Sequence, residues 1–322
     1  MRADFAPMSL QLWLLFFVVV GGLLALDLGI FQKNAHAITL RQALWATALR
    51  VGLACAFGVT IYLGLVGAYE TEAARHRAGA EFFLGYLLEI ALSVDNVFVF
   101  ALVFRYFRVP PELQPRVLFW GILGALVMRA ALIIAGIALV ERFHWVLYIF
   151  AVVLIYGGIK MMKDDKEETD PGKNPLVRLF RRFIPVTDDY RGKKFFVVEN
   201  GVRMATPLCL VLVAIETTDL IFAIDSVPAV LGVTQDFFIV FTSNVFAILG
   251  LRALYFALAG IMELFRFLHY GLSAILIFIG VKMILHGTPW AIHTGQSLVI
   301  VVVLLGASMA ASLMFREKKP AE

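Results

Sequence analysis

Charged residues are scarce in this chain: Asp, Glu, Lys and Arg together make up 16% of its 322 residues. Soluble globular domains contain about 25% charged residues. By contrast, 61% of the residues are hydrophobic, and the mean hydropathy is +0.86. A single soluble core cannot hide this much apolar surface, so the composition excludes a water-soluble domain and predicts an integral membrane protein.

Cysteine is also scarce, with only Cys55 and Cys209, both within apolar stretches. This favours two small buried side chains over a disulfide framework or a thiolate metal site. The sequence has no Gly-x-x-x-x-Gly-Lys loop of the kind that binds nucleotide phosphates. ATP-driven transport by this chain is therefore not expected. Short segments of alternating apolar and polar residues, typical of a membrane β-barrel, are missing as well.

Long apolar stretches recur along the whole chain, and each of them predicts a transmembrane helix. We therefore expect an all-α polytopic membrane protein with about nine spans. The expected spans are roughly 8–30, 43–68, 81–104, 117–139, 145–162, 206–231, 237–260, 268–286 and 294–315.

Basic residues are distributed very unevenly between the two sets of loops. Nineteen Lys and Arg follow the odd-numbered spans, and ten of these lie between residues 163 and 203, whereas the opposite set of loops holds four. Because short loops rich in basic residues stay in the cytoplasm, this predicts an outside N-terminus and a cytoplasmic C-terminus.

The longest polar segment, 163–205, links the fifth and sixth spans. Residues 176–184 place apolar side chains on one helix face and arginines on the other, as in helices that lie on anionic membrane surfaces. Asn200-Gly201 between two short apolar runs predicts a β-hairpin. We interpret the segment as an ordered cytoplasmic connector, and its use for homo-oligomerisation or for binding a membrane partner stays open.

Spans three to five resemble spans six to eight. Asp95 aligns with Asp225. In the same register Glu89 aligns with Asp219, because Glu89 lies six residues before Asp95 and Asp219 lies six residues before Asp225. Because each unit has three helices, an odd number, the two units must insert into the membrane in opposite senses. This is the inverted-repeat arrangement of secondary transporters. The other matched positions are Arg129 with Arg252, and Gly158-Ile159-Lys160-Met161 with Gly280-Val281-Lys282-Met283.

This repeat divides the chain into five expected parts. Two N-terminal helices occupy 1–80, and the two repeats occupy 81–162 and 206–286. The connector occupies 163–205, and a last helix with a basic tail occupies 287–322.

Six carboxylates lie within the expected spans, and each would cost roughly 2.5–3.5 kcal/mol at a helix centre exposed to lipid. They must therefore face a protein interior or a water-filled cavity. Three arginines within the spans cannot neutralise six ionised acids, so protons or cations must balance the remainder. The acids are Asp27, Glu89, Asp95, Glu216, Asp219 and Asp225, and the arginines are Arg50, Arg129 and Arg252.

Oxygen ligands gather on matching faces of the third and sixth spans, with Asp95 and Asp225 each offset by about 120°. Carboxylate, amide and hydroxyl oxygens are the ligands of hard cations such as Mn²⁺, Mg²⁺ or Ca²⁺. We predict that five acids bind a metal ion in preference to pairing only with arginine. Three neutral side chains are predicted to complete the set of ligands. These are Glu89, Asp95, Glu216, Asp219 and Asp225, with Asn96, Ser226 and Asn244 as neutral ligands.

Other polar residues in the spans have structural interpretations. Asp27 is predicted to pair with Arg50, while Asn244 and its neighbour Ser243 could equally form a helix–helix hydrogen bond. Lys160 and Lys282 lie near span ends, where lysines commonly extend toward the membrane surface. Pro228, three residues after Asp225, predicts a kink or local unwinding and an asymmetric site with more ligands from the sixth span.

At these acids the chain resembles the TerC family of integral membrane proteins, particularly its Alx branch. The resemblance extends from the first span to at least residue 286, and its motifs are long and specific. The matching stretches are Gly85–Glu89, Ser93–Val99, Glu216–Ala229 and Thr242–Ala253.

The resemblance implies a bacterial inner-membrane protein of the LysE-like transporter superfamily that acts in metal homeostasis. It also implies a link to manganese export, and the family's name derives from tellurium resistance. Carried over by position, the metal-pathway acids would be the two in span three and the three in span six. We therefore expect a Mn²⁺ transporter that could exchange the metal for protons, without a resident cofactor, nucleic-acid partner or enzymatic activity.

The intramembrane acids and the polar connector also bear on two other classes of function. Asp95 and Asp225 superficially resemble the dyad of an intramembrane aspartyl protease, but the Gly-x-Gly-Asp context is missing around both. A membrane scaffold of a tellurium-resistance, stress or metal-delivery complex, recruiting partners through 163–205, stays open as the alternative to transport.

Overall fold

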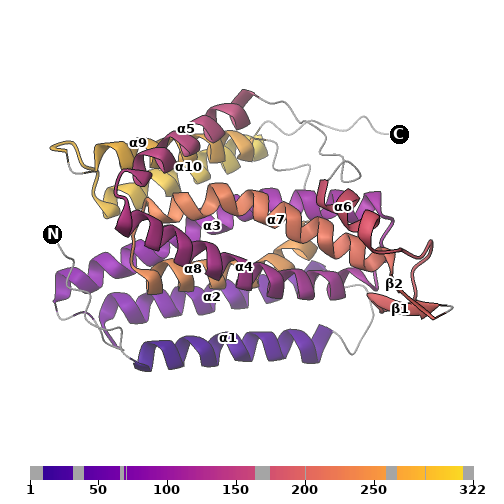
Figure 1. Ribbon diagram of the computed structural model, residues 1–322. Helices are drawn as coiled ribbons and strands as arrows, with labels where there is room; N and C mark the ends of the chain where they lie inside the picture. Colours follow the sequence, from indigo (N-terminus) through magenta and orange to yellow (C-terminus); the bar gives the residue numbers. More distant parts are fainter. Residues whose placement is uncertain are drawn as a thin grey trace.

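The computed structural model describes residues 10–31, 40–65, 69, 71–163, 175–199, 201–258, 267–286 and 288–314, without the side chains of residues 26–31, 40, 175, 176, 252 and 258. Long helices run side by side through the molecule, and a small hairpin projects at one end (Figure 1). Within the described ranges, eight helices are long and apolar enough to cross a membrane, and α1 contributes a shorter apolar stretch. The predicted all-α polytopic fold is confirmed.

The element bounds follow the predicted spans closely, apart from one early helix start. The N-terminal half contains α1 (Leu10–Phe31), α2 (Leu40–Leu63), α3 (Glu72–Tyr106), α4 (Gln114–Arg142) and α5 (Val146–Lys163). The connector contains α6 (Pro175–Phe183), β1 (Phe196–Glu199) and β2 (Val202–Ala205). The C-terminal half contains α7 (Pro207–Leu231), α8 (Phe237–Leu258), α9 (Leu268–Leu285) and α10 (Thr294–Met314).

The helix α3 starts nine residues before the predicted third span. Thr71 caps it by accepting a hydrogen bond from the Ala74 amide, and Glu72 complements the positive end of the helix dipole. With 35 residues, α3 is longer than the roughly 20 residues that cross a bilayer, so it extends beyond the hydrocarbon core.

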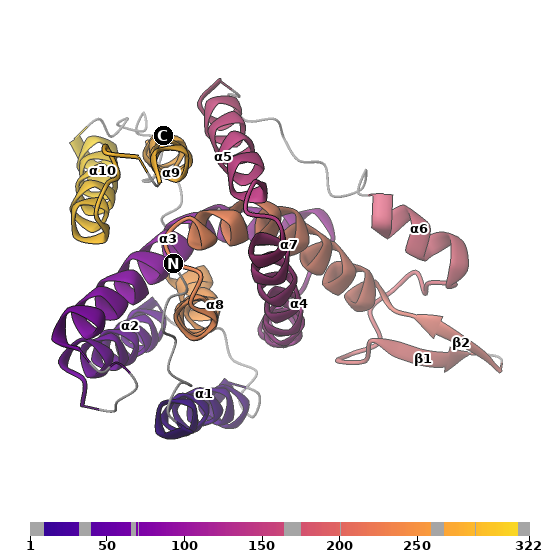
Figure 2. The ribbon, with the colours of Figure 1, turned by 60° about the vertical axis from the view of Figure 1, so that its left-hand side comes forward.

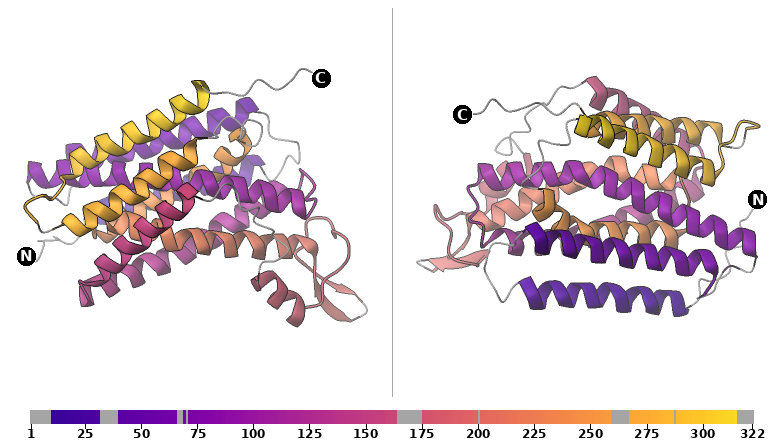
Figure 3. Two further views of the ribbon diagram at one scale, coloured as in Figure 1. Left: turned by 90° about the horizontal axis from the view of Figure 1, so that it is seen from above. Right: turned by 180° about the vertical axis from the view of Figure 1, so that it is seen from behind.

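The helix packing has the pattern expected of inverted repeats. In the repeat, α3, α4 and α5 correspond to α7, α8 and α9. A two-fold axis that relates the repeats exchanges α3 with α7 and α4 with α8. A contact between α3 and α8 therefore requires an equivalent contact between α7 and α4. Both pairs are extensively packed, and α5 packs on its own counterpart α9 (Figure 2). Further views place α10 beside α9 at one edge of the molecule and α1 at the opposite edge (Figure 3).

Two glycines at equivalent repeat positions bring α5 and α9 together. A Cβ atom at Gly158 would lie 2.7 Å from the Ser273 carbonyl oxygen, and one at Gly280 would lie 2.7 Å from the Ala151 carbonyl oxygen. Each glycine therefore accommodates the backbone of the opposite helix, and the contact is reciprocal. The Gly-x-Lys-Met match in the sequence thus corresponds to matched packing.

We expect Gly158→Ala and Gly280→Ala each to destabilise the protein by about 1–3 kcal/mol, because the added methyl group must displace a backbone carbonyl. Gly306→Ala is the matched control, since nothing lies within 4 Å of its Cβ position on α10. Unfolding midpoints in detergent, followed by tryptophan fluorescence, would measure the difference. Equal midpoints for all three variants would contradict the close contact.

The connector folds as predicted, with an amphipathic helix and a hairpin. In the hairpin Glu199 pairs with Val202 across Gly201, whose φ of 78° suits glycine. The Tyr190 hydroxyl donates to the Phe107 carbonyl oxygen at 2.7 Å and ties the connector to the end of α3. Burial raises the pKa of Tyr190 to about 12.

Pro228 does not interrupt its helix. The chain is α-helical from Pro207 to Leu231, and the Pro228 carbonyl accepts from the Gly232 amide at the helix end. The predicted unwinding near Asp225 is therefore wrong. A proline removes only its own amide donor, and here the helix ends one turn later, so few backbone hydrogen bonds are affected.

Candidate ion-binding site

The guanidinium of Arg129 is the centre of a buried polar cluster. Arg129 projects from α4 and is only 2% exposed. Its Nη1 atom pairs with Glu89 on α3, while Nε and Nη2 donate to the two Asp219 carboxylate oxygens on α7 at 3.3 and 3.1 Å. One arginine thus links the central helices of both repeats, and the two acids it binds occupy equivalent repeat positions.

Neutral side chains complete the cluster around Arg129. Its Nη1 atom also donates to Ser226 Oγ at 3.2 Å and to Asn244 Oδ1 at 3.1 Å. Asn96 Nδ2 donates to Asp219 Oδ1 at 3.1 Å. These contacts join α3, α4, α7 and α8 in one hydrogen-bonded network, which we call the Arg129 cluster: Glu89, Asn96, Arg129, Asp219, Ser226 and Asn244.

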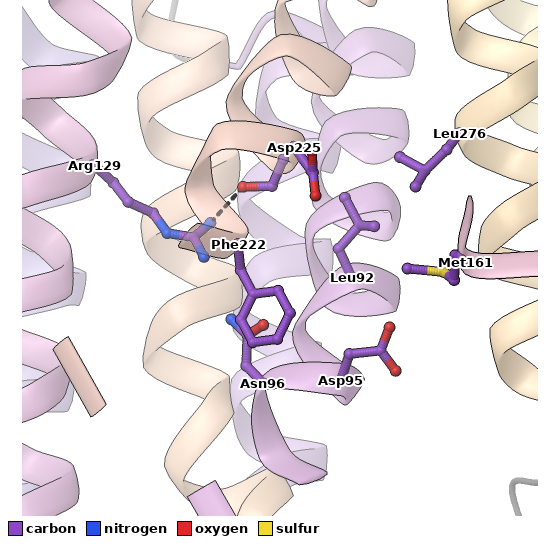
Figure 4. Close-up of a pocket in the computed structure, with 9 residues that line it drawn as sticks. Leu92, Asp95, Asn96, Arg129, Met161, Phe222, Asp225 and Leu276 are labelled. Atoms are coloured by element: carbon purple, nitrogen blue, oxygen red, sulfur yellow. Dashed lines mark hydrogen bonds between the residues drawn. The ribbon is translucent and has the colours of Figure 1, made fainter. Parts of the chain in front are cut away.

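The other symmetry-related pair, Asp95 and Asp225, faces a small pocket between α3 and α7 on one side and α5 and α9 on the other. Neither carboxylate has a hydrogen bond or ion pair with any described residue. Figure 4 shows both acids on the side of the pocket away from Arg129. The residues that line the pocket are Leu92, Asp95, Asn96, Arg129, Met161, Phe222, Asp225, Ser226 and Leu276.

The four aligned acids therefore separate into two environments. Glu89 and Asp219 are fully or almost fully buried and bound to Arg129, whereas Asp95 and Asp225 are partly buried and have no ion pair within the described part of the chain. The 120° offset along each helix produces this separation, because it directs the members of each pair to different sides. Span three and span six contribute one pocket acid each.

Glu216 lies apart from the pocket. Its carboxylate sits against the backbone of α4 at Gly124, where a Cβ atom would overlap the acid. The side chain is half-buried and is not among the residues that line the pocket. Within the described ranges, no group of three or more His, Cys, Asp and Glu side chains is arranged to hold a metal ion.

The predicted charge pair of Asp27 and Arg50 falls partly outside the described residues, as does the side chain of Arg252. Arg50 itself is 5% exposed and donates from Nη1 to the Ala46 carbonyl oxygen at 2.9 Å. Its partner on α1 therefore stays a prediction.

Lys282 is buried, so the interpretation of this lysine as a surface anchor is wrong. It is 7% exposed, and its ammonium nitrogen has no hydrogen-bond partner in the described part of the chain. The equivalent Lys160 is exposed. Unlike Lys160, Lys282 lies near the N-terminal part of α3, where Glu81 is an electrostatic partner.

Sequence reasoning also missed a polar contact at this end of the molecule. Asp236 accepts from the Phe238 amide at 2.9 Å and so caps α8, while Tyr69 donates to its other oxygen at 2.8 Å. Burial raises the pKa of Asp236, and it raises the pKa of Tyr69 as well. An aspartate just before an apolar span is a helix-cap signal that could have identified the first of these contacts.

Comparison with known proteins places this arrangement in a family. The profile described as "Integral membrane protein TerC family" matches residues 74–320, which include both repeats and all four aligned acids. The chain belongs to the TerC family. Its relatives match over nearly their whole length, and no solved structure matches this TerC protein.

Two of these relatives have descriptive names. A Myxococcus xanthus protein named "Uncharacterized membrane protein STKORF319" is 46% identical over 96% of this chain and 94% of its own. An Escherichia coli K12 protein named "Putative membrane-bound redox modulator Alx" is 45% identical over 91% of this chain and 92% of its own. In the present TerC protein, Cys55 and Cys209 are unbridged and lie on different helices, α2 and α7.

Proposed function

We propose that this TerC protein transports a hard divalent cation across the bacterial inner membrane, with Asp95 and Asp225 as its binding carboxylates. One observation carries the proposal: two symmetry-related acids face a common pocket without an ion pair to any described residue, although a neighbouring arginine neutralises other acids. Unpaired carboxylates among membrane-spanning helices are costly, and they commonly mark ion pathways.

The charge of the pocket supports a divalent ion. When ionised, Asp95 and Asp225 carry two negative charges that a single divalent cation would balance. The Ser226 hydroxyl lies at the same pocket and offers a neutral oxygen. Mn²⁺ and Mg²⁺ commonly keep several water ligands, so a site with two carboxylates is sufficient for transient binding.

Mn²⁺ and the direction of export come from the family resemblance alone. In this proposal the N-terminus is outside and the basic connector and C-terminus are cytoplasmic, as the distribution of Lys and Arg predicts. Alternating access would come from rocking of one three-helix repeat against the other, around acids located where the repeats meet.

Reconstitution tests this function. Purified protein in liposomes should take up Mn²⁺, and the same assay with Mg²⁺ and Ca²⁺, with and without a pH gradient, would identify the ion and any proton exchange. The double variant Asp95→Asn, Asp225→Asn should lower the initial rate at least about tenfold, the change produced by losing 1.4 kcal/mol of binding free energy.

Glu141→Gln is the matched control, because Glu141 is an exposed acid near the end of α4 and away from the pocket. It should transport at the wild-type rate. Wild-type liposomes that take up none of these ions faster than empty liposomes would contradict transport and favour a scaffold role. Equal rates in the double variant and the wild type would contradict the site.

A further inference from the structure

The Arg129 cluster carries one unbalanced negative charge among the described side chains. Glu89 and Asp219 contribute two carboxylates and Arg129 contributes one guanidinium, all of them at most 4% exposed. Glu216 is a further acid beside Asp219, but it is half-buried and outside the hydrogen-bonded network. An uncompensated buried charge costs several kcal/mol, so a positive ion should balance the cluster.

Three buried oxygen atoms near this charge have no hydrogen-bond partner among the described residues. They are Glu89 Oε2, Ser93 Oγ and Asn96 Oδ1, on side chains that are 0%, 1% and 1% exposed. The three residues occupy positions i, i+4 and i+7 of α3 and therefore share one face of that helix. Asn244 Nδ2 is also unpartnered but is a donor, so it cannot bind a cation.

The charge and the ligands together identify the kind of ion. No hydrogen bond joins Glu89 Oε2, Ser93 Oγ and Asn96 Oδ1 in the observed geometry, so a proton on Glu89 would cancel the charge but would leave the oxygens of Ser93 and Asn96 without a partner. A water molecule would supply hydrogen bonds but no charge. A divalent ion would over-compensate the single negative charge. A small monovalent metal ion would both neutralise the cluster and interact with the unpartnered oxygens.

We propose that Glu89 and Ser93 form a binding site for a monovalent cation of the Na⁺ type, with Asn96 Oδ1 at the end nearer the C-terminus of α3, directly or through water. The site is distinct from the pocket of Asp95 and Asp225, and binding there does not depend on divalent transport. A further role of this site, binding an ion whose movement is coupled to divalent transport, rests on the proposed function.

The two sites share residues that could transmit occupancy from one to the other. Asn96 and Ser226 line the pocket, and both also belong to the Arg129 cluster. A cation on Asn96 Oδ1 would reorient that amide, whose nitrogen holds Asp219. Occupancy of the cluster would thereby alter the wall of the neighbouring pocket.

Direct binding of ²²Na⁺ to the purified, full-length protein tests the site. Without divalent ions we expect saturable binding that excess NaCl displaces and choline chloride does not. Ser93→Ala should weaken this binding about tenfold, equivalent to about 1.4 kcal/mol. The variant should fold normally, because the Ser93 hydroxyl makes no hydrogen bond to a described residue.

Ser273→Ala controls for the loss of a buried hydroxyl, since Ser273 is 0% exposed on α9 and bonds only within its own helix, to the His269 carbonyl oxygen. It should retain wild-type ²²Na⁺ affinity, and Asp225→Asn should retain saturable ²²Na⁺ binding. The absence of saturable binding between pH 6 and 9, or unchanged affinity in Ser93→Ala, would overturn the proposal. So would loss of binding in Asp225→Asn, because the ion would then lie in the pocket.

These outcomes separate the two proposals. Saturable ²²Na⁺ binding together with no uptake of divalent ions would refute the proposed transport while supporting the cluster site. Uptake of divalent ions without ²²Na⁺ binding would do the reverse.

Discussion

Replacing Arg129 with leucine should destabilise this TerC protein by about 3–5 kcal/mol. Leucine would leave Glu89 and Asp219 buried without the guanidinium that contacts both. It would also remove the donor that reaches Ser226 and Asn244. The expected observation is a large loss of monodisperse protein in detergent and a much lower unfolding midpoint.

A compensated variant distinguishes lost charge balance from lost packing. Arg129→Leu combined with Glu89→Gln and Asp219→Asn has no uncompensated charge in the cluster, so it should recover most of the unfolding midpoint. Arg129→Lys keeps the charge but cannot donate two parallel hydrogen bonds to Asp219, and we expect an intermediate value. A wild-type midpoint for Arg129→Leu alone would contradict the structural role of the cluster.

The fold was largely predictable because membrane helices are specified by local composition. Each span is a long apolar stretch, and the connector stands out by its charge. The early start of α3 was missed because Arg75, His76 and Arg77 interrupt the apolar pattern, and hydropathy cannot distinguish a polar helix start from a loop. The cap at Thr71 determines that boundary instead.

The division of the acids into two environments was only partly predictable. Helix periodicity placed Glu89 and Asp95 on different sides of one span, as the structure shows. Which acids meet an arginine depends on tertiary packing, since α4 lies against α7 and also reaches α3 through Arg129. Glu216 shares a helix face with Asp219, yet its carboxylate rests at Gly124. No pattern within one helix specifies that neighbour.

Lys282 illustrates the same limit. Lys160 and Lys282 occupy equivalent positions near span ends, and both are close to matched glycines. The sequence alone assigns them the same environment. Their burial differs, and Lys282 lies near Glu81 in the extended N-terminal part of α3, a neighbour that comes from another part of the chain.

Replacing either pocket acid, Asp95 or Asp225, should preserve the stability of the protein and reduce metal binding, whereas replacing Arg129 should reduce the stability. Asp95→Asn and Asp225→Asn each remove a carboxylate that has no partner among the described residues, in a largely apolar pocket. Each variant should therefore be as stable as the wild type, or more stable by about 1–2 kcal/mol. The same substitutions leave a single negative charge for a divalent ion, and we expect Mn²⁺ affinity to fall about 10–100-fold.

Two measurements on each purified variant check this expectation: the unfolding midpoint without divalent ions, and Mn²⁺ binding by calorimetry. Glu141→Gln should change neither quantity. A variant that loses both stability and Mn²⁺ binding would indicate that its acid supports the fold, which would contradict a role limited to the ion. Unchanged Mn²⁺ affinity with raised stability would contradict the assignment of Asp95 and Asp225 as metal ligands. The combination of retained stability and lost binding is the one that a transport site predicts, because only a function that needs these carboxylates offsets the cost of keeping them unpaired within the membrane.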